Sequence, residues 1–315
     1  MRNERNVKPW TLCLVFVLTA ITVSCAQSQI PQLGEPPGKA TATATRTASI
    51  TPSAPALVPA PSSTPAICLA ENGRLIEESY DLPGGTNTAP VKIYLPPCYE
   101  KSEEDLPAAY FLHGHPQDEE HWIELGVLET YEALYSLGKI EPMILIFPFL
   151  PEPYFTQSDG GPSSLEEVVL DHLVKMVNSE YRTSAAPSDQ AILGISRGGV
   201  WALEIGFRHP EVFDIVGALS PALAYNHPRR AYDPFIIAQA EDELPSNILI
   251  SVGDREPQFA DEVDRFARQL AASDIDFTYI QHEGRHEDDA WKSILEQVFQ
   301  FVGDALRASR TLVLG

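Results

Sequence analysis

Short apolar runs alternate with longer amphipathic stretches along the chain after about residue 66. The apolar runs have the length and composition of buried strands; they are residues 108–112, 143–147, 190–195, 215–219, 248–252 and 277–280. Between them, residues 165–181 and 259–272 place apolar side chains at helical spacing. This alternation predicts an α/β fold with a mostly parallel sheet and helices on both of its faces. In such sheets, ligands bind beyond the carboxyl ends of the strands.

One predicted strand runs directly into a glycine-flanked serine, in the sequence Gly194-Ile195-Ser196-Arg197-Gly198. A sharp turn from a strand into a helix lifts a serine hydroxyl clear of the sheet, and flanking glycines let neighbouring backbone pass close to it. The backbone N–H of Arg197 then points to where an oxyanion would form. The pattern predicts Ser196 as a nucleophile, with an ordinary glycine-rich turn as the alternative.

An acid and a histidine follow the serine further along the chain. Asp254 and Glu256 come after the predicted strand 248–252, and His286 comes after the predicted strand 277–280. A serine hydroxyl is a poor nucleophile until an imidazole takes its proton, and the imidazole needs a carboxylate to fix its tautomer and stabilise its cation. The order serine, acid, histidine is typical of α/β-hydrolases. We expect His286 to be the base and one of the two carboxylates to be the acid.

Several blocks of sequence resemble the esterase D family of α/β-hydrolases, which includes feruloyl and acetylxylan esterases, S-formylglutathione hydrolases, enterochelin esterases and mycolyltransferases. These blocks are residues 91–97, 109–114, 181–183, 194–199, 208–213 and 284–291. The resemblance covers roughly residues 90–300 and implies an α/β-hydrolase fold and the hydrolysis of carboxylic esters. It favours Glu256 as the acid, because the family carries its acid three residues after the glycine, and leaves Asp254 as the alternative. His115 and Phe149 depart from the family pattern, in which glycine and a polar residue are usual.

The other histidines receive structural interpretations. We expect the side chain of His113 to brace the oxyanion loop and the backbone N–H of His115 to be the second oxyanion donor. His121 and Trp122 either line the substrate cleft or support that loop from within. His209 is expected to end the helix that follows the serine.

Residues His282 to His286 also match the zinc-protease pattern H-E-x-x-H. That pattern holds a metal only on a helix, where residues four apart share one face. The preceding predicted strand and the central Gly284 disfavour a helix, and no third ligand stands at a suitable spacing. We therefore expect no metal and no cofactor, and we interpret His282 as a residue of the surface or of the surroundings of the site.

The first residues of the chain have the features of a signal peptide. Arg2, Arg5 and Lys8 precede a short apolar core at residues 12–23. The small residues before Cys25 resemble the lipobox of bacterial lipoproteins. This predicts a lipid on Cys25 and a membrane-anchored protein outside the cytoplasm, with a plain secretory signal as the alternative.

The predicted organisation has three parts: a signal peptide over residues 1–24, a lipidated linker over residues 25–66 and an esterase domain over residues 67–310. The linker is rich in Pro, Thr, Ala and Ser and has few large apolar residues to bury, so we expect it to be an extended tether.

Four cysteines are present. Cys13 would leave with the signal peptide and Cys25 would carry lipid, so Cys68 and Cys98 remain as a pair in an oxidising compartment. We expect a disulfide between them, with two independent buried thiols as the alternative.

The formal charge of −22 argues against a nucleic-acid partner, because phosphate binding calls for clustered Lys and Arg and the sequence has no such cluster. The function that the residues favour is hydrolysis of a small-molecule or polysaccharide-linked ester through an acyl-enzyme. An acyltransferase with the same residues and a non-catalytic binding lipoprotein of the same fold are the alternatives.

Overall fold

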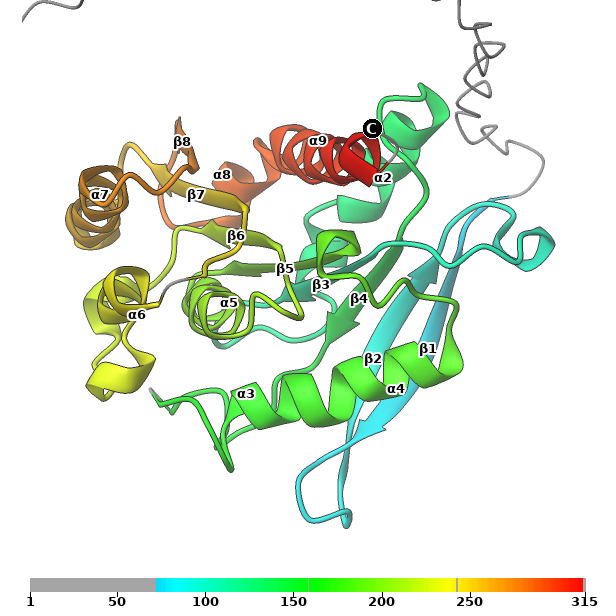
Figure 1. Ribbon diagram of the computed structural model, residues 1–315, viewed down its shortest axis with the longest axis horizontal. Helices are drawn as coiled ribbons and strands as arrows, with labels where there is room; N and C mark the ends of the chain where they lie inside the picture. Colours follow the sequence, from blue (N-terminus) through cyan, green and yellow to red (C-terminus); the bar gives the residue numbers. More distant parts are fainter. Residues whose placement is uncertain (1–71, 158, 242, 314–315) are drawn as a thin grey trace, which may run out of the picture. The chain divides into compact units, whose positions relative to one another are not determined.

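The computed structural model describes residues 72–157, 159–241 and 243–313. It contains an eight-stranded sheet with the order β1-β2-β4-β3-β5-β6-β7-β8 (Figure 1). The strands are β1 (Arg74–Asp81), β2 (Thr88–Leu95), β3 (Ala108–Leu112), β4 (Ile144–Pro148), β5 (Gln190–Ile195), β6 (Ile215–Leu219), β7 (Asn247–Gly253) and β8 (Thr278–His282). β2 pairs antiparallel with β1 and β4, and all other neighbours pair parallel. The predicted α/β class and the mostly parallel sheet are confirmed.

Helices cover both faces of the sheet (Figure 1). They are α1 (His121–Glu124), α2 (Val127–Ser136), α3 (Leu165–Glu167), α4 (Lys175–Glu180), α5 (Arg197–Arg208), α6 (Pro234–Ala240), α7 (Pro257–Ala272), α8 (Asp288–Lys292) and α9 (Leu295–Val313). A π-helical stretch, η2 (Val168–Val174), joins α3 to α4. These three segments form the helix predicted over residues 165–181, and α7 contains the helix predicted over residues 259–272.

Alternate residues of each central strand face opposite helical layers. In β5, Ile192 packs into the cluster formed with α3 to α7, whereas Leu193 packs into the cluster formed with α1, α2, α8 and α9. Tyr110 and Phe111 of β3 divide between the two clusters in the same way. Burial on both faces explains why these strands read as continuous apolar runs in the sequence.

The predicted site residues follow strands that end at one edge of the sheet. Ser196 comes directly after β5, Gly253 ends β7, and His282 ends β8. Because β5, β6, β7 and β8 are consecutive and parallel, their carboxyl ends lie together.

The predictions for the N-terminal part lie outside the described residues. They are the signal peptide, the lipid on Cys25, the tether and the disulfide from Cys68 to Cys98, and all of them stay predictions. Cys98 itself is buried next to the short 3-10 turn Tyr99–Lys101. Between residues 72 and 313, the described helices include none with the length and apolarity needed to cross a bilayer.

Candidate active site

The turn from β5 into α5 holds Ser196 in an unusual backbone conformation, with φ 56° and ψ −115°. A non-glycine residue in such a region stores about 1–3 kcal/mol of strain, which the surrounding structure must offset. Two glycines make the turn possible. A Cβ at Gly194 would lie 2.1 Å from the carbonyl oxygen of Gly198, and a Cβ at Gly198 would lie 2.3 Å from that of His113. The predicted sharp strand-to-helix turn is therefore present.

His286 joins the serine to an acid. Its Nε2 lies 2.8 Å from the Oγ of Ser196, and its Nδ1 lies 2.8 Å from the Oε2 of Glu256. With the ring proton on Nδ1 donated to the carboxylate, Nε2 is free to accept the serine proton. The structure thus brings together Ser196, His286 and Glu256.

The carboxylate of Glu256 is buried and fully hydrogen-bonded. Its Oε1 accepts from the Oγ of Ser220 at 2.8 Å and from the backbone N–H of Gly253 at 2.9 Å. Burial raises the pKa of Glu256, but the hydrogen bonds from His286 and Ser220 outweigh burial and hold this pKa below its usual value. The acid is therefore ionised at neutral pH, as an orienting group for an imidazole must be.

Ser220 is a site residue that the sequence pattern did not reveal. It follows β6, at the same sheet edge as Ser196, and its hydroxyl also accepts a hydrogen bond from the Nε1 of Trp291 at 3.1 Å. The available signal was its position directly after a predicted buried strand.

Asp254 does not contact the histidine ring in the described structure. Its Oδ1 accepts from the backbone N–H of Gly284 at 2.9 Å and lies 3.6 Å from the Nε of Arg255. The side chain is half exposed. Asp254 therefore braces the turn that carries His286 instead of orienting its imidazole.

The two expected oxyanion donors flank the serine. His115 lines a cavity of about 310 Å³ together with Ser196 and His286. In the part of the chain that the structure describes, the backbone N–H groups of Arg197 and His115 have no backbone acceptor. Both N–H groups are thus available to an oxygen bound at the serine.

The side chain of Arg197 turns away to hold a neighbouring loop. Its Nε donates to the carbonyl oxygen of Phe155 at 3.1 Å, and its Nη1 donates to the Oδ1 of Asn226 at 2.9 Å. Phe155 in turn packs edge-on against His113, with ring centroids 4.9 Å apart. The guanidinium therefore supports the structure around the loop after β3.

His113 is buried and braces the loop after β3, which the sequence predicts to be the oxyanion loop. Its Nε2 accepts from the backbone N–H of Leu150 at 2.9 Å, and its Nδ1 lies 2.7 Å from the carbonyl oxygen of Gly114. Burial lowers the pKa of His113 to about 4, so the ring is neutral at neutral pH and carries its proton on Nδ1.

His121 and Trp122 support the loop from within. Both are buried. The Nε1 of Trp122 donates to the carbonyl oxygen of Leu112 at 3.0 Å, and the Nδ1 of His121 accepts from the backbone N–H of Gly114 at 3.4 Å. Of the two interpretations from the sequence, the structure favours loop support over cleft lining.

The H-E-x-x-H segment is not helical, because residue 282 ends β8, residues 283–287 form a turn, and α8 begins only at Asp288. The second histidine of the pattern, His286, is engaged by Ser196 and Glu256. Of the two interpretations of His282, the surface position was wrong, since the residue is buried.

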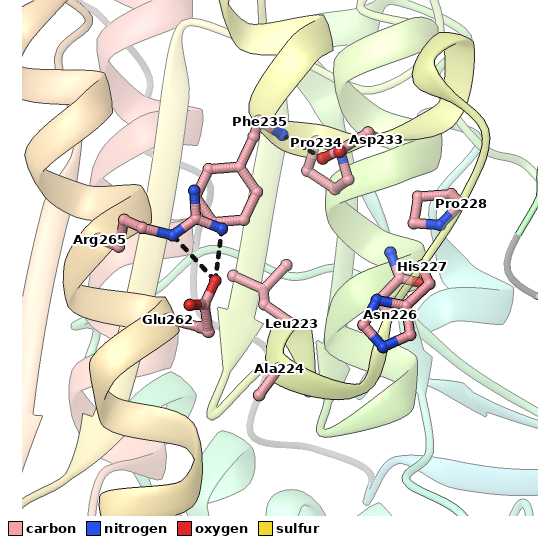
Figure 2. Close-up of a pocket in the computed structure, with 10 residues that line it drawn as sticks. All are labelled: Leu223, Ala224, Asn226, His227, Pro228, Asp233, Pro234, Phe235, Glu262 and Arg265. Carbon is pink, nitrogen blue, oxygen red and sulfur yellow. Dashed lines mark hydrogen bonds and ion pairs between the residues drawn. The ribbon is translucent and has the colours of Figure 1, made fainter. Parts of the chain in front are cut away.

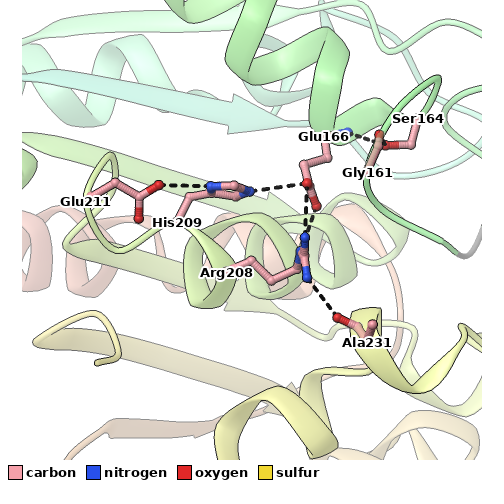
Figure 3. Close-up of polar contacts among 7 residues, drawn as sticks. All are labelled: Gly161, Ser164, Glu166, Arg208, His209, Glu211 and Ala231. Atoms are coloured by element: carbon pink, nitrogen blue, oxygen red, sulfur yellow. Dashed lines mark hydrogen bonds and ion pairs between the residues drawn. The ribbon is translucent and has the colours of Figure 1, made fainter. Parts of the chain in front are cut away.

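His209 ends α5, as predicted, and belongs to a polar cluster at that end of the helix (Figure 3). Glu166 of α3 binds the Nε of Arg208 at 2.9 Å and the Nε2 of His209 at 3.2 Å, and Glu211 binds the Nδ1 of His209 at 3.0 Å. Arg208 is the twelfth residue of α5, so the cluster lies about 18 Å along the helix from the turn at Ser196. The cluster fastens the far end of α5 to α3.

A second cavity, about 590 Å³ in volume, lies between the segment around α6 and the helix α7 (Figure 2). Its lining residues are Leu223, Ala224, Asn226, His227, Pro228, Asp233, Pro234, Phe235, Glu262 and Arg265. None of the three hydrogen-bonded residues Ser196, Glu256 and His286 lines it, so the smaller cavity over the serine is the candidate active site.

Comparisons with known proteins show the family of the chain. A family model described as "Putative esterase" matches residues 86–302. The chain is 27% identical over 217 residues to an endo-1,4-beta-xylanase/feruloyl esterase of Xylanibacter ruminicola. This alignment covers 66% of this chain and 28% of the relative. It is 26% identical over 113 residues to the ferri-bacillibactin esterase BesA of Bacillus subtilis, in an alignment that covers 35% of this chain and 38% of the relative. The chain thus spans well under half of the length of both relatives.

Among solved structures, a ferulic acid esterase superposes with a TM-score of 0.66 at 20% identity, over 75% of this chain and 99% of that one. This likeness shows that the fold is that of the α/β-hydrolases.

Proposed function

We propose that this chain, which belongs to the "Putative esterase" family, hydrolyses carboxylic esters through an acyl-enzyme formed on Ser196. The observation that supports this proposal best is the pair of 2.8 Å hydrogen bonds at the two nitrogens of His286, one to Ser196 and one to Glu256. A histidine bonded in this way serves as the general base of a serine hydrolase.

In the proposed reaction, the Oγ of Ser196 attacks the ester carbonyl carbon while the Nε2 of His286 takes the hydroxyl proton. The carbonyl oxygen becomes an oxyanion, which accepts hydrogen bonds from the backbone N–H groups of Arg197 and His115. The bond to the alcohol then breaks, and the alcohol leaves with the proton from His286. Water repeats the sequence on the acyl-enzyme, which releases the carboxylic acid and restores Ser196.

The proposed substrates are esters of small molecules or of polysaccharide-linked acyl groups. The cavity over the serine, at about 310 Å³, is at the lower end of the range of small-molecule sites. The names of the two relatives point to feruloyl and ferri-bacillibactin esters, so a substrate panel needs acetyl, feruloyl and lactone esters.

A fluorophosphonate probe tests the mechanism directly. Wild-type protein is expected to gain one covalent probe on Ser196, and Ser196→Ala is expected to gain none while losing several orders of magnitude in p-nitrophenyl acetate turnover. Ser136→Ala, on the exposed face of α2, is the matched control. Undiminished turnover in Ser196→Ala would exclude the acyl-enzyme. Product analysis with added alcohols separates hydrolysis from acyl transfer, because a transferase makes a new ester.

We further propose that the protein works outside the cytoplasm, attached to a membrane by lipid on Cys25. The lipobox-like sequence and the basic, then apolar, N-terminus support this proposal. Cys25→Ser is expected to move the protein from the membrane fraction to the soluble extracytoplasmic fraction, and Cys13→Ala to leave it in the membrane fraction. A wild-type protein that is already soluble would favour the plain secretory signal.

A further inference from the structure

The ring of Phe259 lies flat against the imidazole of His286. The ring centroids are 3.7 Å apart and the planes differ by 3°. This is the shortest separation between ring centroids among the described residues, where the other pairs lie at 4.9 Å or more. Trp291 meets the same imidazole at nearly a right angle, with centroids 4.9 Å apart. The histidine therefore has one face covered by a phenyl ring.

The first turn of α7 supplies both the acid and this ring. Glu256 is the N-cap residue of α7, Pro257 opens the helix, and the backbone N–H of Phe259 donates to the carbonyl oxygen of Glu256 at 2.9 Å. A rigid proline at the first helical position is favourable for starting a helix there. The spacing from Glu256 to Phe259 therefore fixes the carboxylate and the phenyl face relative to each other.

Tyr225 holds Phe259 from another direction. The two ring centroids are 5.5 Å apart, and the hydroxyl of Tyr225 donates to the Oε1 of Gln258 at 3.0 Å. Phe259 is half-buried and packs against the apolar core on the α7 side of the sheet. These contacts keep the phenyl ring parallel to the imidazole.

From this geometry we propose that Phe259 is a positioning residue that stabilises the imidazolium of His286. The inference rests on the proposed function, in which His286 becomes a cation when it takes the serine proton. The face of a phenyl ring is negative and attracts a cation. The attraction is weak while the imidazole is neutral and grows as the proton arrives, so it favours the transition state over the resting enzyme.

Several charged and titratable groups also face the imidazole. Glu256 binds its Nδ1 from the start of α7. The cavity over Ser196 and His286 is also lined by His115 from the loop after β3 and by Glu287 and Asp288 from the start of α8. Substitutions at position 259 change none of these charges, so they isolate the contribution of the phenyl face.

The test compares Phe259→Leu with Phe259→Tyr by kcat/KM for p-nitrophenyl acetate across pH. Leucine removes the π face, and we expect kcat/KM to fall about three- to tenfold, mainly through kcat. The acid limb of the pH–rate profile should move to lower pH, because a less stable imidazolium loses its proton at lower pH. Tyrosine keeps the π face and is expected to stay within about twofold of the wild type. Phe301→Leu, a half-buried phenylalanine of α9 on the other face of the sheet, is the control for general packing loss.

Replacing Phe259 by 3,4,5-trifluorophenylalanine keeps the test valid if the leucine variant does not fold. Fluorine weakens the negative face without changing the shape of the ring, so kcat/KM is expected to fall and the acid limb to move in the same direction. An unchanged acid limb in both variants, or equal losses for leucine and tyrosine, would overturn the proposal. Failure of the proposed function is distinct, because the wild type would then react with no fluorophosphonate at all.

Discussion

Two buried glutamates, one at the start of α7 and one inside α5, differ in charge at neutral pH: the first is ionised and the second is mostly protonated. Glu256 is 3% exposed and Glu204 is 0% exposed. Glu256 receives hydrogen bonds from His286, Ser220 and the backbone of Gly253, and its pKa is lowered. Glu204 receives one, from the Nδ2 of Asn226 at 2.9 Å. Its other carboxyl oxygen has no partner among the described residues.

Burial raises the pKa of Glu204 to about 8, because the hydrogen bond from Asn226 and the charge of Arg197 only partly compensate for lost hydration. The comparison teaches that hydrogen-bond donors around a buried carboxylate can outweigh the effect of burial on its pKa, as they do at Glu256 and not at Glu204. Glu256 lies at a helix start and beside strand ends, where backbone and side-chain donors are available. Glu204 lies in the middle of α5, where the backbone N–H groups are used within the helix.

Removing the charge at position 256 is expected to have the largest effect. Glu256→Gln keeps the shape of the side chain but loses the negative charge and the tautomer control over His286. We expect turnover of p-nitrophenyl acetate to fall by a factor on the order of 10⁴, as for other triad carboxylates changed to amides. Steady-state kinetics at neutral pH measure this loss. A loss below tenfold would mean that His286 works without this acid.

The charge state of Glu204 is expected to affect the free energy of unfolding and not the turnover. Its folded-state pKa of about 8 lies above the usual 4.5. Between these values the folded protein holds a proton that the unfolded chain has released, so this contribution to stability is complete below pH 4.5 and is lost as pH rises to about 8. Glu256 has the opposite pH dependence. Because its pKa is lowered, its ionised form stabilises the folded protein above pH 4.5, and this stabilisation is lost as the pH falls.

Glu204→Gln isolates this effect. At pH 5 the variant and the wild type should have similar free energies of unfolding, because the carboxyl is protonated in the folded protein. At pH 9 the variant should be more stable than the wild type by on the order of 3–5 kcal/mol. Urea unfolding at both pH values measures the difference, with Glu124→Gln, an exposed residue of α1, as control. Equal pH dependence of wild type and variant would show that Glu204 is ionised in the fold.

Ser220→Ala is expected to move Glu256 part of the way toward the state of Glu204. The variant loses one of the three donors to the carboxylate and the acceptor of Trp291. A hydrogen bond to a charged group contributes about 1.5–3 kcal/mol, so we expect the free energy of unfolding to drop by about 2 kcal/mol and turnover to fall about tenfold. Ser136→Ala again serves as control. Full activity in Ser220→Ala would show that the remaining donors hold the carboxylate alone.

The three hydrogen-bonded residues Ser196, Glu256 and His286 were predictable because each leaves a local signature. Ser196 has flanking glycines, and Glu256 and His286 follow apolar runs in the chain order typical of the fold. The outer contacts of the site leave no such signature. Ser220 meets Glu256 across 36 positions of sequence, through the placement of β6 between β5 and β7.

The contacts of two further residues could not be predicted from the sequence for the same reason. Phe259 fits the helical spacing of α7, so it reads as a core residue, and its parallel contact with His286 depends on how α7 meets the loop after β8. His282 ends β8, whose other residues are exposed or half-buried, and the pattern offers no sign that its side chain turns inward. Local patterns therefore predict the three hydrogen-bonded residues, whereas the residues that contact them are set by tertiary packing.

The smallest effect is expected at Asp254, the carboxylate that the sequence leaves as the alternative acid. Its hydrogen bond to the backbone of Gly284 supports the turn before His286, and its half-exposed side chain is screened by solvent. Asp254→Asn keeps an oxygen that can accept this hydrogen bond, so we expect kcat to stay within about threefold of the wild type. The same p-nitrophenyl acetate assay measures both substitutions, Asp254→Asn and Glu256→Gln. A large loss confined to Asp254→Asn would reverse the assignment and require the turn after β7 to rearrange before catalysis, so that Asp254 replaces Glu256 at the Nδ1 of His286.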